Sequence, residues 1–439
     1  MPPPMPPVDA PPSDCNCSEV QAELEAKLKD LEERLANETK LRAAELKAME
    51  ERTEAALEAI RQFRNDAGPD NVLYLHLTLV PYIKTSGELK TKPTQHSVKM
   101  LREIGIQPDI LLCRSDRDIP KSTREKIALF CNVEGDCVIA CPDVRNIYQL
   151  PYTLHEEDLD DRILEKLGIW AAAARLDPWV ELVDRMDKAK KTANVCIVGK
   201  YVHLADTYKS LNEALTHGGI ANGAKVNLEF VDSETIDPTN VQASLGHADA
   251  ILVPGGFGER GVEGKIGAIR WARENDVPFF GICLGMQMAV VEFARNVSKL
   301  KGANSIEFDA ETPYPVVDLM EEQKDVTQMG ATMRLGSYPC SLKEDSLAAE
   351  IYGGSKEISE RHRHRFEVNN SYREPLGESG LIFSGVSPDG QLVEMVELAR
   401  EDHPYFVGCQ FHPEFCSRPF EPHPLFAHFI KASLASKNS

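Results

Sequence analysis

One cysteine and, far downstream, a histidine and a glutamate have the types and spacing of a nucleophile, its base and the group that orients the base. Cys283 ends an apolar run between Gly281 and Gly285, and a stretch with helical periodicity begins at the next residue. His412 and Glu414 stand two residues apart after a second strand-like run. Glycines around the cysteine permit a sharp strand-to-helix turn that exposes a nucleophile. The pattern predicts acyl transfer through a cysteine.

A single cysteine in an apolar run is more often a packed core residue than a nucleophile. Here the glycine-flanked turn coincides with the His-x-Glu pair and with a glycine-rich segment, residues 254–258, that is suited to hold an oxyanion. The N-terminal end of the helix after Cys283 carries partial positive charge, which favours a thiolate. We therefore expect Cys283 to be the nucleophile, and Cys196, Cys340 and Cys409 to be structural.

The composition is that of an acidic globular protein. The 439 residues are 42% hydrophobic and carry a formal net charge of −20 at pH 7. Without a basic excess to neutralise phosphates, we expect no nucleic-acid partner. No run of about 18 apolar residues and no signal-peptide pattern occurs, so we expect no membrane association. Eleven scattered cysteines without paired zinc-binding motifs suit a reducing compartment, and we expect a cytoplasmic protein.

The chain falls into segments of different composition. We expect residues 1–17, which are rich in proline, to be a disordered tail. Residues 18–65 contain neither glycine nor proline, and their leucines alternate at spacings of three and four. This pattern predicts one long helix of coiled-coil type, with a solvated single helix as the alternative. We expect a small domain over 71–150, a linker over 151–192 and a large domain over 193–434.

Short strands alternate with helices in both domains, which predicts parallel sheets in an α/β fold. In the first domain we expect a buried strand over 72–80, further strands over 110–113 and 137–140, and helices over 95–104 and 121–130. In the second we expect strands over 195–198, 226–231, 250–253 and 279–283, helices over 265–274 and 284–297, and a hairpin over 381–398. Such a doubly wound domain places its site at the carboxyl ends of its strands, where Cys283 stands.

Three motifs resemble the class I glutamine amidotransferases, namely Pro254-Gly255-Gly256-Phe257-Gly258, Gly281-Ile282-Cys283-Leu284-Gly285-Met286-Gln287 and Phe411-His412-Pro413-Glu414. Three further segments resemble the CTP synthase family, namely KTKPTQ at 90–95, MRLG at 333–336 and ERHRHRFEVN at 360–369. The resemblance runs from about Asn71 to Lys431. It implies a flavodoxin-like glutaminase domain and, over 71–150, a partial Rossmann-like synthetase domain.

The resemblance implies a reaction in two halves. One domain hydrolyses glutamine and releases ammonia, while the other phosphorylates UTP with Mg-ATP so that ammonia displaces the phosphate to give CTP. Cys283 would attack the glutamine carboxamide, with His412 moving the proton and Glu414 orienting His412. The other implied glutamine-binding residues are Gly256, Leu284, Gly285, Met286, Gln287, Glu307 and Arg365. The implied contacts to UTP or CTP are Lys90, Thr91, Lys92, Pro93, Thr94, Gln95 and Lys126.

The sequence departs from the family pattern where the synthetase domain should begin. Family members start with a strand, a glycine-rich phosphate loop and acidic magnesium ligands, whereas this sequence contains no Gly-x-x-x-x-Gly-Lys-Ser/Thr. The helical leader occupies that place. Mg²⁺ and ATP are therefore implied by the family while their main sites are missing, and we expect no metal ligands and no cofactor in the glutaminase domain.

The implied partners are glutamine, UTP or CTP, GTP as an activator, and either further copies of this chain or full-length CTP synthase. We expect the chain alone to be limited to the glutaminase half-reaction. Two other interpretations fit the same sequence. One is a regulatory or scaffolding paralogue that makes no CTP and acts through its coiled coil and its CTP synthase surfaces. The other is an unrelated leader joined to a truncated enzyme by an error in the gene prediction.

Overall fold

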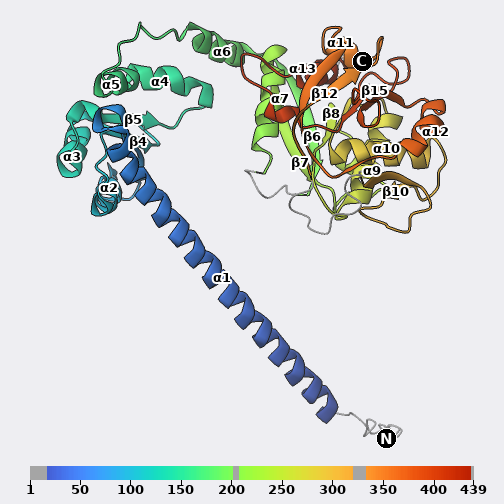
Figure 1. Ribbon diagram of the computed structural model, residues 1–439, viewed down its shortest axis with the longest axis horizontal. Helices are drawn as coiled ribbons and strands as arrows, with labels where there is room; N and C mark the ends of the chain where they lie inside the picture. Colours follow the sequence, from blue (N-terminus) through green and yellow to red (C-terminus); the bar gives the residue numbers. More distant parts are fainter. Residues whose placement is uncertain (1–16, 201–206, 320–332, 437–439) are drawn as a thin grey trace, which may run out of the picture. The chain divides into compact units, whose positions relative to one another are not determined.

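The computed structural model describes residues 17–200, 207–319 and 333–436, shown as a ribbon in Figure 1. The chain divides into two compact units, Met1–Leu176 and Asp177–Ser439, which are described separately. Their boundary falls inside the segment 151–192 that we expected to be a linker. The disordered tail expected over 1–17 lies outside the described residues, except that Cys17 begins the first helix.

Unit 1 is built on a three-stranded parallel sheet of order β1-β4-β5. Its strands are β1 (Leu75–Leu79), β2 (Tyr82–Ile83), β3 (Glu88–Leu89), β4 (Ile110–Ser115) and β5 (Val138–Pro142). Its helices are α1 (Cys17–Ala67), α2 (Lys92–Ile104), α3 (Lys121–Cys131), α4 (Leu150–Glu156) and α5 (Leu159–Lys166). The strands and helices expected in this domain are confirmed to within a few residues, because their apolar periodicity is strong.

The strand expected over 72–80 differs from its prediction in burial. We expected a buried strand, but β1 lies at an edge of the sheet, with β4 as its neighbour. Successive side chains of a strand point to opposite faces. Thr78 is buried, whereas Leu75, Leu77 and Leu79 are 38%, 58% and 54% exposed. One face of β1 is therefore apolar and open.

Helix α1 is 51 residues long, and its C-terminal end packs against the rest of unit 1. The Tyr74 hydroxyl donates to the Ile60 carbonyl at 2.9 Å. The Arg64 guanidinium binds both oxygens of Asp109, at 3.1 and 3.2 Å, and Asp109 also accepts from the Tyr74 backbone N–H. Every side chain from Leu35 to Ala56 is exposed. The last turns of α1 thus belong to the packed unit, while the segment before them is solvated.

Unit 2 contains a nine-stranded sheet of order β13-β12-β15-β16-β17-β9-β8-β6-β7 and a three-stranded sheet of order β10-β11-β14. The strands from β17 to β7 run parallel, and those from β13 to β17 pair antiparallel. The strands are β6 (Lys191–Gly199), β7 (Ala224–Asp232), β8 (Ala250–Val253), β9 (Phe279–Ile282), β10 (Asn304–Ser305), β11 (Pro315–Leu319), β12 (Arg334–Leu342), β13 (Glu357–His364), β14 (Phe366–Val368), β15 (Ile382–Val386), β16 (Val393–Glu397) and β17 (Phe406–Cys409). The helices are α6 (Asp177–Lys188), α7 (Lys209–Ala221), α8 (Gln242–Leu245), α9 (Val262–Glu274), α10 (Leu284–Asn296), α11 (Leu347–Ile351), α12 (Arg373–Glu378) and α13 (Pro424–Ser436).

Helices cover both faces of the large sheet, so unit 2 has two hydrophobic cores. Helices α9 and α10 contribute to one core, and α7, α11 and α13 to the other (Figure 1). Burial on both faces explains why strands such as β8 and β9 are continuously apolar. The doubly wound α/β fold expected from the sequence is confirmed. The hairpin expected over 381–398 is the antiparallel pair β15–β16.

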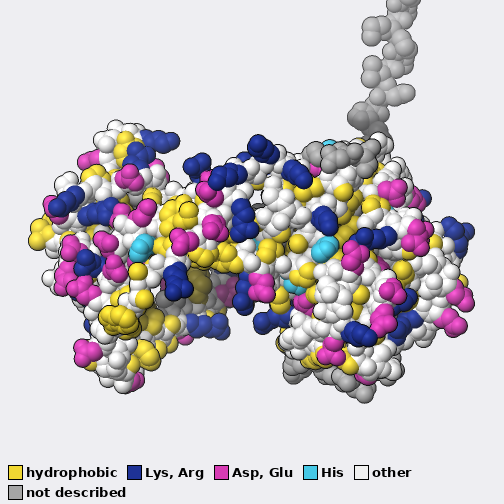
Figure 2. Space-filling model, turned by 90° about the horizontal axis from the view of Figure 1, so that it is seen from above, with side chains coloured by type: hydrophobic (Ala, Val, Ile, Leu, Met, Phe, Trp, Pro, Cys, Tyr) yellow, Lys and Arg dark blue, Asp and Glu magenta, His cyan; other side chains and the backbone are white. Residues whose placement is uncertain are grey.

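The surface carries charges of both signs. Figure 2 shows acidic and basic side chains interspersed over the visible face, with hydrophobic side chains among them. Among the residues described, no helix is long and apolar enough to cross a membrane.

Candidate active site

Cys283 stands at a tight turn between β9 and α10. Its backbone has φ 52° and ψ −104°, a conformation that L-residues seldom adopt. A Cβ on Gly285 would lie 2.0 Å from the Val253 carbonyl oxygen, and one on Gly281 would lie 2.7 Å from the Gly285 carbonyl carbon. Only glycine fits at both positions, so the two glycines make the turn possible. The cysteine is then held at the carboxyl end of β9, as the sequence predicted.

His412 and Glu414 follow β17, which pairs in parallel with β9. The register places Cys409 beside Ile282, and the Cys283 backbone N–H donates to the Cys409 carbonyl at 2.7 Å. His412 Nδ1 lies 2.7 Å from Glu414 Oε1, and both side chains are largely buried. Two strands that are distant in sequence thus bring the expected nucleophile, base and orienting carboxylate to one place.

The charges around His412 favour its protonated form. Burial alone would lower the pKa of its imidazole, but a hydrogen bond and negative charge from Cys283, and then the same from Glu414, raise that pKa to about 10. The imidazole therefore lies between two groups of negative character, one at the nucleophile and one behind it. This arrangement stabilises an imidazolium, which can give its proton to a leaving group.

A pocket of about 410 Å³ opens over these residues. Cys283, His412, Glu414 and the backbone of Gly255 and Gly256 line it, together with residues of α7. A Cβ on Gly255 would come within 2.8 Å of His412 Cε1, so only glycine lets the loop pass so close to the base. The sequence motifs predict a role for Gly256 but none for Gly255 itself. The close approach of these two segments of the chain is visible only in the folded protein.

Two side chains hold the glycine-rich loop from outside the pocket. The Lys200 ammonium donates to the carbonyls of Phe257 and Gly258. Glu307 Oε1 accepts from the Gly258 backbone N–H at 2.7 Å, and burial raises the pKa of the Glu307 carboxyl. Glu307, an expected glutamine-binding residue, thus contacts the loop and does not line the pocket. The sequence analysis missed Lys200, because a lysine after a strand is an unspecific signal.

A buried amide pair lies behind the nucleophile. Gln410 is fully buried, and its Nε2 donates to Cys283 Sγ at 3.5 Å. Gln287 Nε2 donates to Gln410 Oε1 at 3.1 Å and to the Phe366 carbonyl at 2.8 Å. The side-chain amide of Gln287, another expected glutamine-binding residue, is therefore already hydrogen-bonded to other groups of the protein. Gln410 was missed, and its position just before Phe411-His412 was the one available signal.

The other expected glutamine-binding residues differ in where they lie. Leu284 and Met286 are buried in the core at the start of α10, and Gly285 packs against Val253. Arg365 is partly buried, and among the described residues its Nε has no hydrogen-bond partner. Arg363, two residues earlier, lines the pocket instead. The roles of these residues toward a bound substrate stay predictions.

The expected nucleotide contacts at 90–95 lie at the start of α2 in unit 1, whereas Lys126 lies on α3. Thr91 precedes the helix, and Gln95 Nε2 donates to its hydroxyl oxygen at 3.1 Å. Lys90 forms an ion pair with Glu88, whose carboxyl pKa is lowered by Lys90 and, to a smaller extent, by Lys126. Exposed ammonium groups beside a helix N-terminus are suited to bind phosphate. The remaining members of this group are Lys92 and Pro93, which are exposed, and Thr94, which donates to the Leu79 carbonyl.

Comparison with known proteins identifies the family. The profile of the class I glutamine amidotransferases matches residues 203–432, and that of the CTP synthase N-terminus matches residues 29–169. The second match begins inside α1, so the likeness to the family starts earlier than the Asn71 indicated by the motifs.

Curated relatives agree with these matches. The chain is 60% identical over 378 residues to CTP synthase of Syntrophus aciditrophicus, covering 86% of this chain and 70% of that protein. It is 58% identical over 383 residues to CTP synthase of Geobacter sulfurreducens, covering 87% and 71%. Among solved structures, the glutaminase domain of Trypanosoma brucei CTPS with bound acivicin matches with TM-score 0.52 and 41% identity, over 55% of this chain and 93% of that one. The chain therefore belongs to the CTP synthase family of glutamine-hydrolysing ligases and carries the family's class I glutamine amidotransferase domain.

Proposed function

We propose that this chain hydrolyses glutamine at Cys283 and supplies the ammonia half of the CTP synthase reaction. The observation that supports this most directly is the position of Cys283, His412 and Glu414 around one pocket, with His412 Nδ1 2.7 Å from Glu414 Oε1. A thiolate, an imidazolium and a carboxylate in this order are the groups that amide cleavage through a thioester requires.

In the proposed mechanism the Cys283 sulfur attacks the carboxamide carbon of glutamine. His412 gives its proton to the departing nitrogen, which leaves as ammonia while a thioester remains on Cys283. His412 then accepts a proton from water, and the resulting hydroxide equivalent cleaves the thioester to glutamate. Backbone N–H groups at Gly256 and Leu284 would bind the oxyanion in both steps.

The α-carboxylate and α-ammonium groups of glutamine need partners of opposite charge. We assign the α-carboxylate to the Arg365 guanidinium and the α-ammonium to the Glu307 carboxylate, since charge-assisted hydrogen bonds are the strongest available. Both side chains lie in unit 2 and outside the immediate pocket lining. Binding would therefore require the loop at Gly256 to adjust. Gln287 would act through its bond to Gln410 and not by direct contact.

In unit 1 we assign UTP or CTP to residues 90–95 and Lys126, on the strength of the cationic start of α2. Glutamine, uridine and cytidine nucleotides, and GTP as an activator, are the proposed small-molecule partners. Cysteine side chains described in both units are free, which suits a reducing environment, and we propose a cytoplasmic location.

We assign no residue of this chain to Mg²⁺ or ATP, because the sequence contains no phosphate-loop pattern. We therefore propose that the chain by itself carries out only the glutaminase half-reaction.

The long helix favours a second candidate function, that of a regulatory or scaffolding paralogue. Leu35, Leu46 and Met49 are 65%, 57% and 60% exposed on α1. Exposed leucines at coiled-coil spacing gain stability by packing against another helix. The partner would be a second copy of this chain or a full-length CTP synthase.

The proposed function is tested by measuring glutamate release and thiol labelling in the same preparations. Cys283→Ser should reduce glutamine hydrolysis by at least ~10³-fold, and His412→Ala by ~10²–10⁴-fold, because nucleophile and base act together. Glu414→Gln should lose less, since it removes the orienting charge and keeps the base. A glutamine-analogue electrophile should modify Cys283 in the unchanged chain.

Cys416→Ser is the matched control, since Cys416 is an exposed thiol close to His412 in sequence. It should keep both hydrolysis and labelling. Label found on another cysteine while Cys283 stays free, or full activity in His412→Ala, would refute the assignment.

A further inference from the structure

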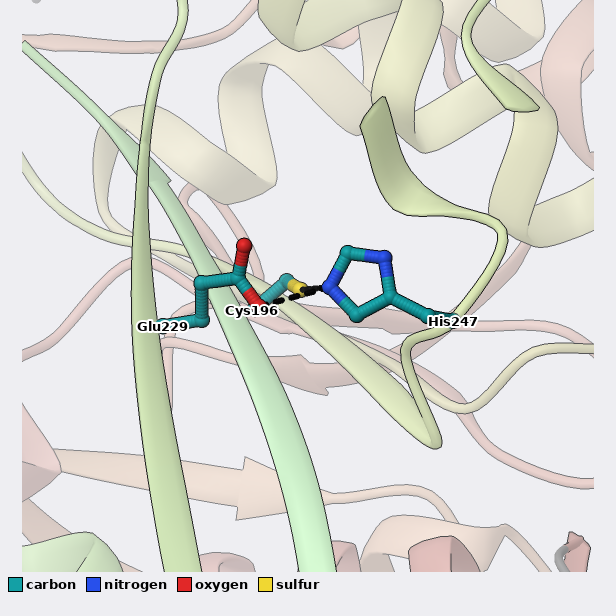
Figure 3. A group of neighbouring side chains, drawn as sticks. All are labelled: Cys196, Glu229 and His247. Carbon is teal, nitrogen blue, oxygen red and sulfur yellow. Dashed lines mark hydrogen bonds and ion pairs between the residues drawn. The ribbon is translucent and has the colours of Figure 1, made fainter. Parts of the chain in front are cut away.

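Three donor groups that the glutaminase site does not use converge at one edge of the large sheet. Figure 3 shows Cys196 on β6, Glu229 on β7 and His247 in the connection between α8 and β8. Cys196 and Glu229 are register partners on adjacent parallel strands. His247 Nε2 lies 2.6 Å from Glu229 Oε2 and 3.8 Å from Cys196 Sγ. One donor atom from each residue lies within 4.8 Å of the other two.

We propose that Cys196, Glu229 and His247 form a zinc-binding site. Zinc binds sulfur at about 2.3 Å, and nitrogen or oxygen at about 2.0–2.2 Å, which separates the donors of a tetrahedral site by roughly 3.3–3.8 Å. The distance of 3.8 Å between Sγ and Nε2 already suits such a site. The carboxylate must move away from the imidazole to admit the ion. It is free to do so, because the Glu229 and His247 side chains are 55% and 52% exposed.

The chemistry of the donors selects the metal. A thiolate with an imidazole and one carboxylate suits zinc, whereas magnesium and calcium prefer sites made of oxygen atoms. The His247 and Glu229 side chains are more than half exposed, so a fourth position would face solvent and hold water. Zinc binding would release the thiol proton of Cys196 to solvent and leave a sulfur–zinc bond.

Without bound metal, the Cys196 thiol should be unreactive. Cys196 is buried, and burial, followed by the charges of Glu229 and Asp249, raises the pKa of its thiol to about 12. Without metal the sulfur is thus a protonated core atom beneath an exposed histidine–glutamate pair. Bound zinc, by contrast, would link β6, β7 and the loop between α8 and β8. None of the three donors lines the candidate catalytic pocket, so the site does not depend on the proposed glutaminase function.

The test uses the full chain carrying Cys283→Ser, which removes the competing thiol beside His412. Cobalt(II) is added as a spectroscopic probe, followed by zinc as a competitor. We expect thiolate-to-cobalt charge-transfer absorption that zinc displaces. His247→Ala and Glu229→Gln, both at exposed positions, should weaken cobalt binding at least tenfold, and Cys196→Ser should abolish the charge-transfer band.

His155→Ala is the matched control. His155 Nδ1 lies 2.8 Å from Asp160 Oδ2 and is partly exposed, but within the described ranges this pair belongs to no group of three metal donors. The control should bind cobalt like its parent, and zinc should raise the melting temperature of both but not that of His247→Ala. A parent without the charge-transfer band, or a band that persists unchanged in His247→Ala, would overturn the proposal.

Discussion

At the scale of single residues, the candidate site depends on groups that stand behind the three expected catalytic side chains. Gln410 donates to the Cys283 sulfur, and Gln287 fixes the orientation of Gln410 by donating to its oxygen. Lys200 and Glu307 hold the loop that carries Gly256, one of the two expected oxyanion donors. We expect these groups to position the proposed reacting atoms, and their effect on rate is open to measurement.

Gln410→Met tests this positioning role. The substitution roughly preserves volume but removes the N–H donated to sulfur, and a hydrogen bond to a charged group contributes about 1.5–3 kcal/mol. We expect kcat for glutamine hydrolysis to fall by about 10- to 150-fold with KM little changed, and alkylation of Cys283 at pH 7 to slow in parallel. Gln242→Met, at an exposed position on α8, is the control. An unchanged kcat would mean that Gln410 only fills space.

At the scale of elements, strand periodicity explains the Arg-His-Arg-His motif of β13. Arg361 and Arg363 are exposed, while His362 and His364 are buried. His362 Nδ1 lies 3.0 Å from His364 Nε2, and Arg334 on β12 forms an ion pair with Glu394 on β16 at 2.6 Å. This polar cluster lies inside the sheet region next to the site. Burying two neutral imidazoles makes that region sensitive to acid.

The histidines of β13 should make unit 2 labile at low pH. Burial, followed by the charge of Arg334, lowers the pKa of His364 from 6.5 to about 3. A group whose pKa is lower in the folded than in the unfolded state contributes stability at pH values above its ordinary pKa. That stability is lost as pH falls through the pKa of the folded state. The free energy of unfolding should therefore decrease as pH falls from 6.5 toward 3, and less steeply in His364→Gln.

Urea unfolding of unit 2, followed by near-ultraviolet circular dichroism at pH 7, 5 and 4, measures this effect. His155→Gln is the control, because His155 is partly exposed and Asp160 raises the pKa of its imidazole. Equal acid sensitivity in the unchanged chain and His364→Gln would contradict the prediction.

Helix α1 should associate through its exposed apolar seam. Leu46→Glu with Met49→Glu places two charges on that seam, which would disfavour packing against another helix. We expect the unchanged chain to show a concentration-dependent mass above that of the monomer in sedimentation equilibrium, and the double variant to sediment closer to the monomer.

Lys47→Glu adds negative charge on another side of the same turn and should leave the mass unchanged. A monomeric unchanged chain at all concentrations would favour the alternative of a solvated single helix.

At the scale of the whole molecule, the chain combines a class I amidotransferase domain with a smaller unit bearing the expected nucleotide segment. Phosphoryl transfer depends almost entirely on positioning and charge stabilisation by donors and magnesium. The sequence offers no phosphate-loop pattern to supply them. We therefore expect this chain to carry out the glutaminase half-reaction without the phosphorylation half-reaction.

The purified chain should not form CTP from UTP, Mg-ATP and glutamine. Added ammonia should not rescue synthesis, which distinguishes a missing phosphorylation centre from a failure to deliver ammonia. Product analysis by chromatography measures this, with Cys283→Ser as a control for glutamine use. CTP formed from ammonia at a rate proportional to the concentration of this chain, without any full-length enzyme, would contradict the prediction.

The amino-acid sequence by itself determined the elements and the residues that we expect to react. Short continuous apolar runs located β8 and β9, and helical periodicity located α10, almost to the residue. Gly281 and Gly285 marked the turn at Cys283. All of these signals are local. His412 and Glu414 could also be predicted from a local signal, because they stand together in one motif.

Only the tertiary structure decided which distant groups meet. The contact of Gln410 with Cys283 depends on the register of β17 against β9, and that of Cys196 with Glu229 on the register of β6 against β7. The exposure of the β1 leucines is likewise visible only in the tertiary structure. Register and strand order arise from packing across the whole core, so no local pattern along the chain encodes them.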